Sequence, residues 1–394
     1  MREVVIIDGV RTPIGRMGGS LSSFRAEELF AIVLRGLLDK TGVGPDLIDD
    51  VYMGAAITSR AINAARWAVL KAGFPYSVPA MGVERQCGSG LQTIALAAQA
   101  IMSGEADVVI AGGAESWSTV PFMLARYSEP KPFSLTPPTV FDRETGPGPL
   151  DFTMGMTAEN LAEKYQISRE EQDSFSLESQ RRALRAAAEG RFAEEIIEVS
   201  VPQKRGEPLR FEADEHPRET TLEKLSALPA IFKDGGTVTA GSSSGLNDGA
   251  VALLVMSRER ADQLGLRPLG RYLATSVVGV DPAIMGIGPA FAIPKVLKKT
   301  GLAWQDISVI ECNEAFAAQT LAVVKELDRS GYKVDMEALN PNGGAIALGH
   351  PNGASGGRLA LSLLRELRRR KSRFGIASLC IGGGQGVATV FEAL

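Results

Sequence analysis

Hydrophobic and polar positions along the chain alternate between strand-like and helix-like patterns. Residues 1–8 form an N-terminal strand pattern, and residues 91–102 have the pattern of a buried helix with small apolar side chains. A short apolar run at 106–111, closed by two glycines, has the pattern of a buried strand. This alternation of helices and strands predicts an α/β fold of stacked layers with a mostly parallel sheet.

One structural unit occurs twice in the sequence. In each copy a glycine–serine turn opens a helix, and a buried strand that ends in glycines follows the helix. The copies span residues 87–113 and 353–383. The spacing from the serine of the turn to the closing glycine is similar in both copies, and such a repeat predicts two similar halves.

The middle of the chain departs from this pattern. Residues 120–244 are richer in proline, charge and loop-forming residues, and a capping box at Ser168 begins their one clear helix. We predict that 120–244 is a loop domain inserted into a first half made of residues 1–119 and 245–268, with residues 269–394 forming the second half. Insertions of this size are uncommon unless they are functional.

Composition and charge narrow the possible functions. The 394 residues are 45% hydrophobic, which is ordinary for a folded protein and excludes global disorder. The 42 basic and 46 acidic side chains give a net charge of −4, so we expect no nucleic-acid partner. No apolar stretch reaches 18 residues and no signal peptide precedes the first strand, so we expect a cytoplasmic protein with no membrane partner. The three widely spaced cysteines fit reduced thiols, and neither they nor the two histidines have the spacing of a metal site.

Cys87 is the first candidate for chemistry. A strand-like approach reaches it, and a helix opens directly after it with Gly88, Ser89 and Gly90. A thiol at a helix N-terminus faces unpaired N–H groups and the positive end of the helix dipole, which favour the thiolate. The alternative for a lone cysteine is a small buried core residue.

His350 is one of only two histidines. It follows an apolar, glycine-lined segment, residues 343–349, that we interpret as a strand. An imidazole at the end of such a segment, directly before Pro351, is a candidate base that deprotonates a nucleophile. A packed, hydrogen-bonded core histidine is the alternative at this position.

Two further glycine patterns partly match known functional motifs, a dinucleotide-binding loop and the nucleophile elbow of a hydrolase, but neither has the secondary structure that its motif requires. The run after Cys380 has the glycines of a dinucleotide-binding loop, but a strand pattern at 387–391 follows where a helix is required. Residues 241–245 fit Gly-x-Ser-x-Gly around Ser243, and a strand-like segment again follows in place of a helix. A serine hydrolase with His216 as its base therefore stays open as an alternative.

Five motifs together resemble the thiolase family, acyltransferases that make or cleave a carbon–carbon bond beside a coenzyme A thioester. The motifs are Cys-Gly-Ser-Gly-Leu-Gln at 87–92, the segment 241–250, Asn-Glu-Ala-Phe-Ala at 313–317, the segment 343–351, and Cys-Ile-Gly-Gly-Gly at 380–384. The similarity runs almost from end to end. It implies two halves in layered α-β-α-β-α packing, an inserted loop domain that binds coenzyme A, and a homodimer or homotetramer.

The resemblance also implies a role for each motif. Cys87 is expected to accept the acyl group, and His350 to deprotonate it. Cys380 is expected to move the proton at the α-carbon of acetyl-CoA. His350 and a water held by Asn313 are expected to stabilise the enolate oxygen, and the backbone N–H groups of Cys87 and Gly382 the thioester oxygen.

Coenzyme A is expected to contact the inserted domain and its neighbours. Ser244 falls where the family hydrogen-bonds the pantetheine arm. Arg218 is a candidate partner for the adenosine phosphates, with a solvated loop arginine as the alternative. The apolar side chains expected to line the thioester tunnel are Met154, Phe232, Met285 and Phe316.

Three positions depart from the family pattern. Thr153 stands where short-chain enzymes usually carry histidine, which weakens an inference of strict short-chain specificity. Asn352 replaces a residue that is usually aliphatic, so a polar side chain beside the catalytic loop can reshape the acyl pocket. Trp117 replaces a usually smaller or more flexible side chain, and the sequence assigns no effect to it.

The expected function is acetyl-CoA C-acetyltransferase activity. This is the reversible condensation of two acetyl-CoA molecules through an acetyl-cysteine intermediate, with no cofactor beyond the coenzyme A thioesters. Cleavage of longer 3-ketoacyl-CoA chains in fatty-acid β-oxidation is the main alternative. A serine hydrolase using Ser243 and a non-catalytic acyl-CoA-binding relative are the other two.

Overall fold

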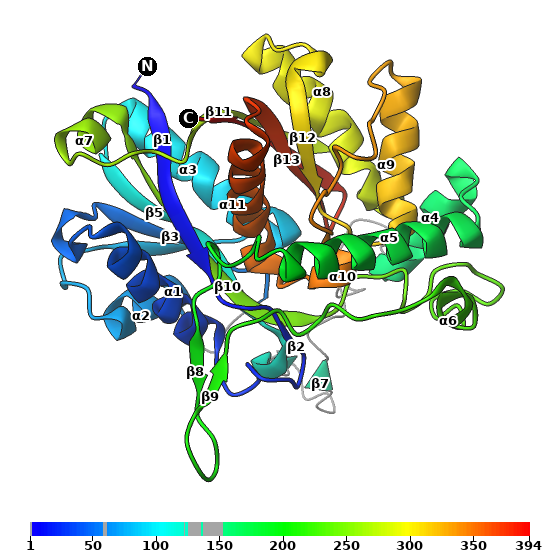
Figure 1. Ribbon diagram of the computed structural model, residues 1–394, viewed down its shortest axis with the longest axis horizontal. Coiled ribbons are helices and arrows are strands. Elements are labelled where there is room, and N and C mark those ends of the chain that lie inside the picture. The colour runs from blue at the N-terminus through cyan, green and yellow to red at the C-terminus, as the bar shows by residue number, and fades with distance from the viewer. Residues whose placement is uncertain (1, 58–60, 122, 125–134, 137–152) are drawn as a thin grey trace, which may run out of the picture.

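A continuous ten-stranded sheet forms the centre of the molecule (Figure 1). The computed structural model describes residues 2–57, 61–121, 123–124, 135–136 and 153–394. The strands, in spatial order, are β12 (Ile307–Cys312), β13 (Phe374–Ile381), β14 (Gln385–Ala393), β11 (Gly270–Gly279), β1 (Val4–Arg11), β10 (Asn247–Ser257), β5 (Val108–Ser116), β3 (Asp50–Gly54) and β4 (Ala80–Val83), with β2 (Gly15–Arg16) paired to β10.

Most neighbouring strands in this sheet are antiparallel. The parallel pairs are confined to its two ends, where β12 pairs with β13 and β3 pairs with β4 and β5. The prediction of a mostly parallel sheet is therefore wrong. A tight turn of glycines at 382–384 joins β13 directly to β14, and a hairpin of this kind requires an antiparallel pair.

Three layers of helices enclose the two halves of the sheet (Figure 1). The helices are α1 (Ala26–Thr41), α2 (Ala64–Ala72), α3 (Ser89–Ser103), α7 (Arg258–Gln263), α8 (Gly288–Thr300), α9 (Ala317–Arg329), α10 (Ala345–Leu348) and α11 (Asn352–Arg370). The middle helices α3 and α11 share one core with both halves. Helices α1 and α2 cover the outer face of the first half, and α8 and α9 cover the outer face of the second. This order confirms the layered α-β-α-β-α fold.

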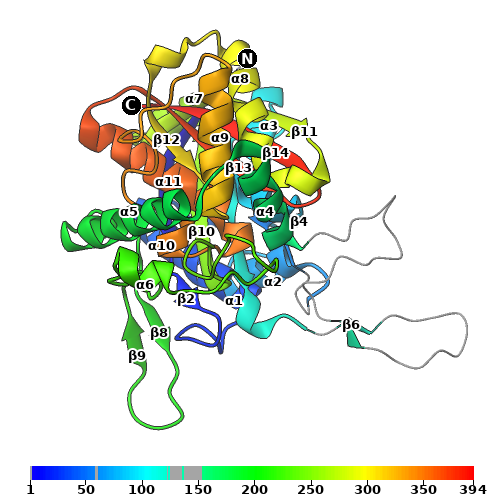
Figure 2. The ribbon, with the colours of Figure 1, turned by 90° about the vertical axis from the view of Figure 1, so that its right-hand side faces the viewer.

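The segment between β5 and β10 lies along one edge of these layers. Its described elements are β6 (Met123–Leu124), β7 (Leu135–Thr136), α4 (Met154–Tyr165), α5 (Arg169–Ala188), β8 (Val199–Val201), β9 (Leu209–Phe211) and α6 (Leu222–Ser226). The predicted capping box of α5 is present, because Ser168 Oγ accepts a hydrogen bond from the N–H of Glu171 and the Glu171 carboxylate accepts one from the N–H of Ser168. Helix α4 joins the core of the second half, whereas the β8–β9 hairpin projects away from the body in both views (Figure 2).

The two middle helices are nearly in backbone contact. A Cβ atom on Gly90 in the first turn of α3 would lie 2.5 Å from the carbonyl oxygen of Gly353 and 3.0 Å from the nitrogen of Gly357 on α11. Only glycine permits this distance. The two copies of the repeat therefore meet at their glycine–serine turns, and these turns adjoin Cys87 and His350 in the sequence.

Within the part of the chain that the structure describes, no helix combines the length and apolarity needed to cross a bilayer.

Replacing Gly90 with alanine is expected to destabilise the protein by about 1–3 kcal/mol, because the new methyl group meets backbone atoms that cannot move aside. Urea-induced unfolding measures this loss. Gly279→Ala is the matched control, since a Cβ atom there meets no atom of the described residues within 4 Å. Equal stability of the two variants would contradict the close helix contact.

Candidate active site

Four segments that are distant in sequence deliver the candidate catalytic residues to one place. Cys87 lies in the 3-10 helix η2 (Gln86–Gly88) that precedes α3, and His350 directly precedes α11. Cys380 belongs to β13, and Asn313 follows the end of β12. Cys87 is partly exposed, whereas Cys380 is buried.

The segment before His350 differs from its predicted conformation. Residues Ala345–Leu348 form the helical turn α10 in place of a strand, and Gly349 ends this turn with φ +98°. Glycine is favoured at such a positive φ because it carries no Cβ atom. His350 itself makes a single β-bridge to Leu246, so only this residue of the segment pairs in a strand-like way.

Two donors face the sulfur of Cys87 in addition to its own backbone N–H. The side-chain Nδ2 of Asn352 lies 3.2 Å from Sγ and donates a hydrogen bond to it, and the backbone N–H of Gly382 also points at Sγ. Cys380 is near enough that a charge on Cys87 raises its pKa, in addition to the larger effect of burial. The predicted residues Cys87, Cys380 and Gly382 are thus brought together.

The Cys87 thiol is neutral at rest. Burial raises its pKa, and this effect exceeds the opposite effect of the Asn352 amide and the Gly382 N–H. Burial therefore outweighs the thiolate-favouring effect expected of the helix N-terminus. Formation of the nucleophile requires a base.

The neutral imidazole of His350 is such a base. Burial, with a smaller contribution from the charge of Arg358, lowers the pKa of His350 to about 3. Nε2 of His350 faces two amide donors, Nδ2 of Asn313 and Nδ2 of Asn352, each at 3.4 Å, so Nε2 is the acceptor. Nδ1 therefore carries the proton and donates it to Ser355 Oγ at 2.6 Å. This tautomer leaves the lone pair of Nε2 facing the site. Sequence reasoning missed Ser355, although its position as the serine of the second glycine–serine turn was an available signal.

Hydrogen bonds of Asn313 and of the next residue, Glu314, fix the position of Asn313. Its backbone N–H donates to the carbonyl of Ser378 at 2.9 Å. The next residue, Glu314, is buried and accepts hydrogen bonds from Ser179 Oγ at 2.6 Å and from Asn340 Nδ2 at 2.8 Å. Oδ1 of Asn313 is buried and has no hydrogen-bond partner among the described residues. The position fits the predicted water site, which stays a prediction.

The residues predicted to line the thioester tunnel lie in one apolar cluster. They are Met154, Phe232, Met285 and Phe316. The rings of Phe232 and Phe316 meet edge to face with centroids 6.0 Å apart. The backbone N–H of Ser244 donates to the carbonyl of Ala315 at 2.9 Å, so Ser244 also lies beside this cluster.

Arg218 lies in a basic group beside the site. Desolvation and the like charge of Arg16 lower its pKa, and burial with the charges of both arginines lowers the pKa of His216 to about 4. Asn247 connects this group to the catalytic loop, because its side chain lies 3.4 Å from His216 Nδ1 and accepts the backbone N–H of His350 at 3.0 Å. Two arginines held near each other suit an anionic ligand.

Ser243 does not have the surroundings of a nucleophile. Its Oγ donates to the carbonyl of Thr239 at 2.6 Å, and strand β10 begins four residues later where a nucleophile elbow requires a helix. The structure thus gives no support to the serine hydrolase alternative.

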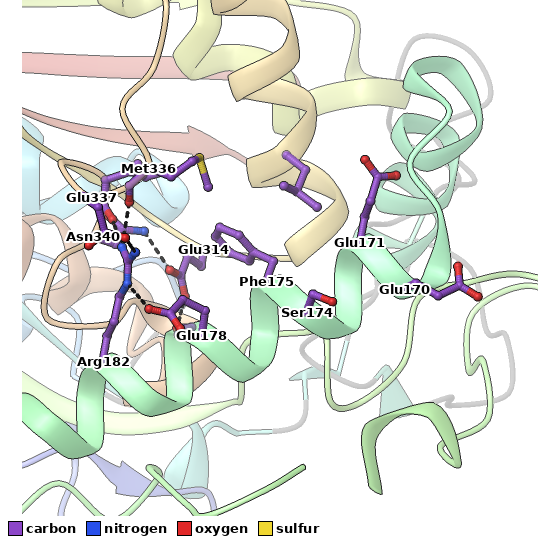
Figure 3. Close-up of a pocket in the computed structure, with 13 residues that line it drawn as sticks. Glu170, Glu171, Ser174, Phe175, Glu178, Arg182, Glu314, Met336, Glu337 and Asn340 are labelled. Atoms are coloured by element: carbon purple, nitrogen blue, oxygen red, sulfur yellow. Dashed lines mark hydrogen bonds and ion pairs between the residues drawn. The ribbon is translucent and has the colours of Figure 1, made fainter. Parts of the chain in front are cut away.

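A cavity of about 640 Å³ beside α5 and α9 lies outside this constellation (Figure 3). Its lining includes the carboxylates of Glu170, Glu171, Glu178, Glu314 and Glu337, and none of the cysteines. With five carboxylates against the one guanidinium of Arg182, such a lining disfavours the phosphates of coenzyme A. The cavity therefore does not extend the candidate site.

The three departures from the family pattern have distinct surroundings. Thr153 caps α4, since its Oγ1 accepts the N–H of Met156 at 3.3 Å. Asn352 and Trp117 contact each other, because the indole Nε1 donates to Asn352 Oδ1 at 2.8 Å. The contact between Asn352 and Trp117 was not predicted from the sequence.

Comparison with known proteins decides the family. The family model for the thiolase N-terminal domain matches residues 4–259, and the model for the thiolase C-terminal domain matches residues 266–393. The chain belongs to the thiolase family. This confirms the resemblance seen in the motifs.

Relatives of this thiolase match it over their whole length. An acetyl-CoA acetyltransferase of Chromobacterium violaceum is 48% identical, over 99% of each chain. A 3-oxoadipyl-CoA/3-oxo-5,6-dehydrosuberyl-CoA thiolase of Escherichia coli is 47% identical, over 100% of each chain. Among solved structures, the Bacillus anthracis acetyl-CoA acetyltransferase superposes with a TM-score of 0.93 at 44% identity, covering 100% of this chain and 99% of the other.

Ser355→Ala is expected to lower kcat of this thiolase about tenfold, because the loss of one hydrogen bond frees the imidazole to adopt the tautomer with Nε2 protonated. Steady-state kinetics measure the change. Ser362→Ala is the matched control in the same helix, since the Ser362 hydroxyl bonds Glu195 and not the imidazole. Similar losses in both variants would count against the tautomer assignment.

Proposed function

We propose that this protein is an acetyl-CoA C-acetyltransferase that converts two acetyl-CoA molecules to acetoacetyl-CoA and coenzyme A, reversibly. The observation that carries the proposal is the convergence of Cys87, Cys380 and His350 beside the N–H of Gly382. Full-length similarity to proteins named acetyl-CoA acetyltransferase supports it.

The first half-reaction uses Cys87 and His350. Nε2 of His350 takes the thiol proton, and the sulfur attacks the carbonyl carbon of acetyl-CoA. The bond from that carbon to the coenzyme A sulfur then breaks, and the departing thiolate takes the proton back from His350. The products are acetyl-Cys87 and free coenzyme A. A neutral imidazole with a free Nε2 is the form that this step needs.

The second half-reaction uses Cys380. Cys380 first passes its thiol proton to Nε2 of His350, and its thiolate then removes a proton from the methyl group of a second acetyl-CoA. The resulting carbanion attacks the carbonyl of acetyl-Cys87. The sulfur of Cys87 leaves as a thiolate and takes the proton held by His350, and acetoacetyl-CoA forms. Burial raises the pKa of Cys380, so its resting thiol already holds the proton that the reverse reaction delivers to the carbanion. Donors such as the Gly382 N–H and the Asn313 amide are placed to stabilise the oxyanions.

Substrate binding follows the same arrangement. The apolar cluster of Met154, Phe232, Met285 and Phe316 is the proposed site of the thioester arm, and Ser244 lies beside it. Arg218 with neighbouring Arg16 is the proposed partner of the phosphates. The chemistry uses coenzyme A thioesters as substrates and calls for no bound cofactor. We infer a cytoplasmic homodimer or homotetramer. The three free thiols support the compartment, and exposed apolar side chains near the edge strand β4, among them Trp67 and Met81, support self-association.

Incubation with labelled acetyl-CoA is expected to leave one acetyl group on the peptide that contains Cys87, because acyl transfer precedes condensation. Peptide mass spectrometry detects the label. Cys87→Ala is expected to lose the label and all activity, whereas Cys380→Ser keeps the label and loses condensation. Cys312→Ala is the matched control, since Cys312 is a buried thiol to which no step is assigned. Label on Ser243, or on no residue, would contradict the proposal.

Cleavage of longer or polar 3-ketoacyl-CoA chains is a second candidate. Thr153 caps α4 where the family's short-chain enzymes carry histidine, and one close relative is named a 3-oxoadipyl-CoA thiolase. We expect kcat/KM for acetoacetyl-CoA to exceed that for 3-ketoacyl-CoA chains of six or more carbons. Steady-state cleavage rates across such a series measure this order. The reverse order would favour the second candidate.

A further inference from the structure

The amide of Asn352 lies between the candidate nucleophile and its base. Nδ2 of this residue is 3.2 Å from Cys87 Sγ and 3.4 Å from His350 Nε2. Within the described residues, no hydrogen bond joins Cys87 Sγ to His350 Nε2 directly. The –NH2 group of Asn352 therefore lies within hydrogen-bond distance of both reacting atoms, Cys87 Sγ and His350 Nε2.

Trp117 fixes which end of that amide faces the sulfur. The indole N–H can only donate a hydrogen bond, and it lies 2.8 Å from Asn352 Oδ1. The carbonyl oxygen of the amide must therefore point toward Trp117, and Nδ2 must point toward Cys87 and His350. Without the indole, the amide is free to turn its oxygen toward the sulfur.

Both partners of this contact are anchored in the fold. The turn that carries Trp117 is held by buried Asp248, which accepts the N–H of Ser118 at 3.0 Å. The residue after Asn352 is held by buried Glu115, which accepts the N–H of Gly353 at 3.0 Å. Strand β5 and the turn after it thus fix the start of α11, and the amide has little freedom to leave the sulfur.

The effect of the amide changes as the proton moves. While His350 is neutral, Nδ2 of Asn352 donates to both Sγ and Nε2. Once Nε2 has taken the proton from Cys87, it is a donor and can no longer accept a hydrogen bond. Nδ2 of Asn352 then donates only to the sulfur of Cys87. A hydrogen bond to a charged acceptor is stronger than one to a neutral acceptor. The amide therefore stabilises the sulfur most at the moment when its charge forms.

We propose that Asn352 is a catalytic hydrogen-bond donor to the Cys87 sulfur, and that Trp117 is the positioning residue that orients its amide. The proposal rests on the proposed function only in taking Cys87 as the nucleophile. It assigns a shared purpose to two departures from the family pattern that lie 235 positions apart in the sequence.

The test is the rate at which iodoacetamide alkylates Cys87 at pH 8, followed by mass spectrometry of its peptide. This reaction reports the thiolate fraction and needs no turnover, so it is independent of the acetyl-labelling test of the proposed function. Asn352→Leu is expected to slow alkylation about tenfold, equivalent to a rise of about one unit in the thiol pKa. Trp117→Phe is expected to slow it about threefold, since the amide remains but loses its orientation. Trp304→Phe is the matched control, because its indole donates to the distant Lys333 carbonyl.

Two further variants test whether the N–H donor of Asn352 is needed, rather than any polar side chain, and whether Trp117 acts through Asn352. Asn352→Asp keeps the size and the contact with Trp117 but replaces the donor by a charge, so alkylation is expected to be slower than with leucine. The double variant Asn352→Leu/Trp117→Phe is expected to match Asn352→Leu alone, because Trp117 acts through the amide.

Two results would overturn the proposal. The first is an alkylation rate in folded Asn352→Leu equal to that of the wild-type protein; altered relative kcat/KM among acyl chains in that variant would then assign Asn352 to recognition of the acyl chain. The second is multiplication of the two single effects in the double variant.

Discussion

The close backbone contact between α3 and α11 is the constraint on which the site depends. Gly90 and Gly356 leave no room for a Cβ atom where the first turns of the two helices cross, because it would meet backbone atoms of the other helix. A Cβ atom on Gly88 would in turn lie 2.7 Å from the side chain of Ile381, so the Cys87 turn is also pressed against the end of β13. Because these contacts involve the backbone, the positions of Cys87, His350 and Gly382 are set by the packing of the core and not by flexible side chains.

Burial is the second consequence of this packing. The packing that assembles the site also buries its groups, which raises the pKa of Cys87 and Cys380 and lowers that of His350. All three groups therefore rest in their neutral forms. Charge appears only when a proton passes between them, and the fixed donors around Cys87 then act in a medium where electrostatic interactions are strong.

The sequence alone predicted the family, the layered fold and the residues that meet at the site, because each sits in a motif with a turn, a glycine or a cap that dictates local structure. Strand direction was not predictable from helix and strand alternation, and the turn Ala345–Leu348 was mistaken for a strand because four apolar residues fit either conformation. Ser355, Asn352 and Trp117 were missed as partners for a different reason. Their contacts depend on hydrogen-bond direction between distant segments, and periodicity carries no information about direction.

The seam between the two halves of the sheet has a consequence for how the molecule unfolds. Strands β1 and β11 pair over only two positions, Val5 with Arg271 and Ile6 with Gly270. The middle helices, by contrast, bury side chains against strands of both halves in one shared core. Neither half can keep its inner face covered if the other melts, so the duplicated architecture is a single cooperative unit and not two domains that fold on their own.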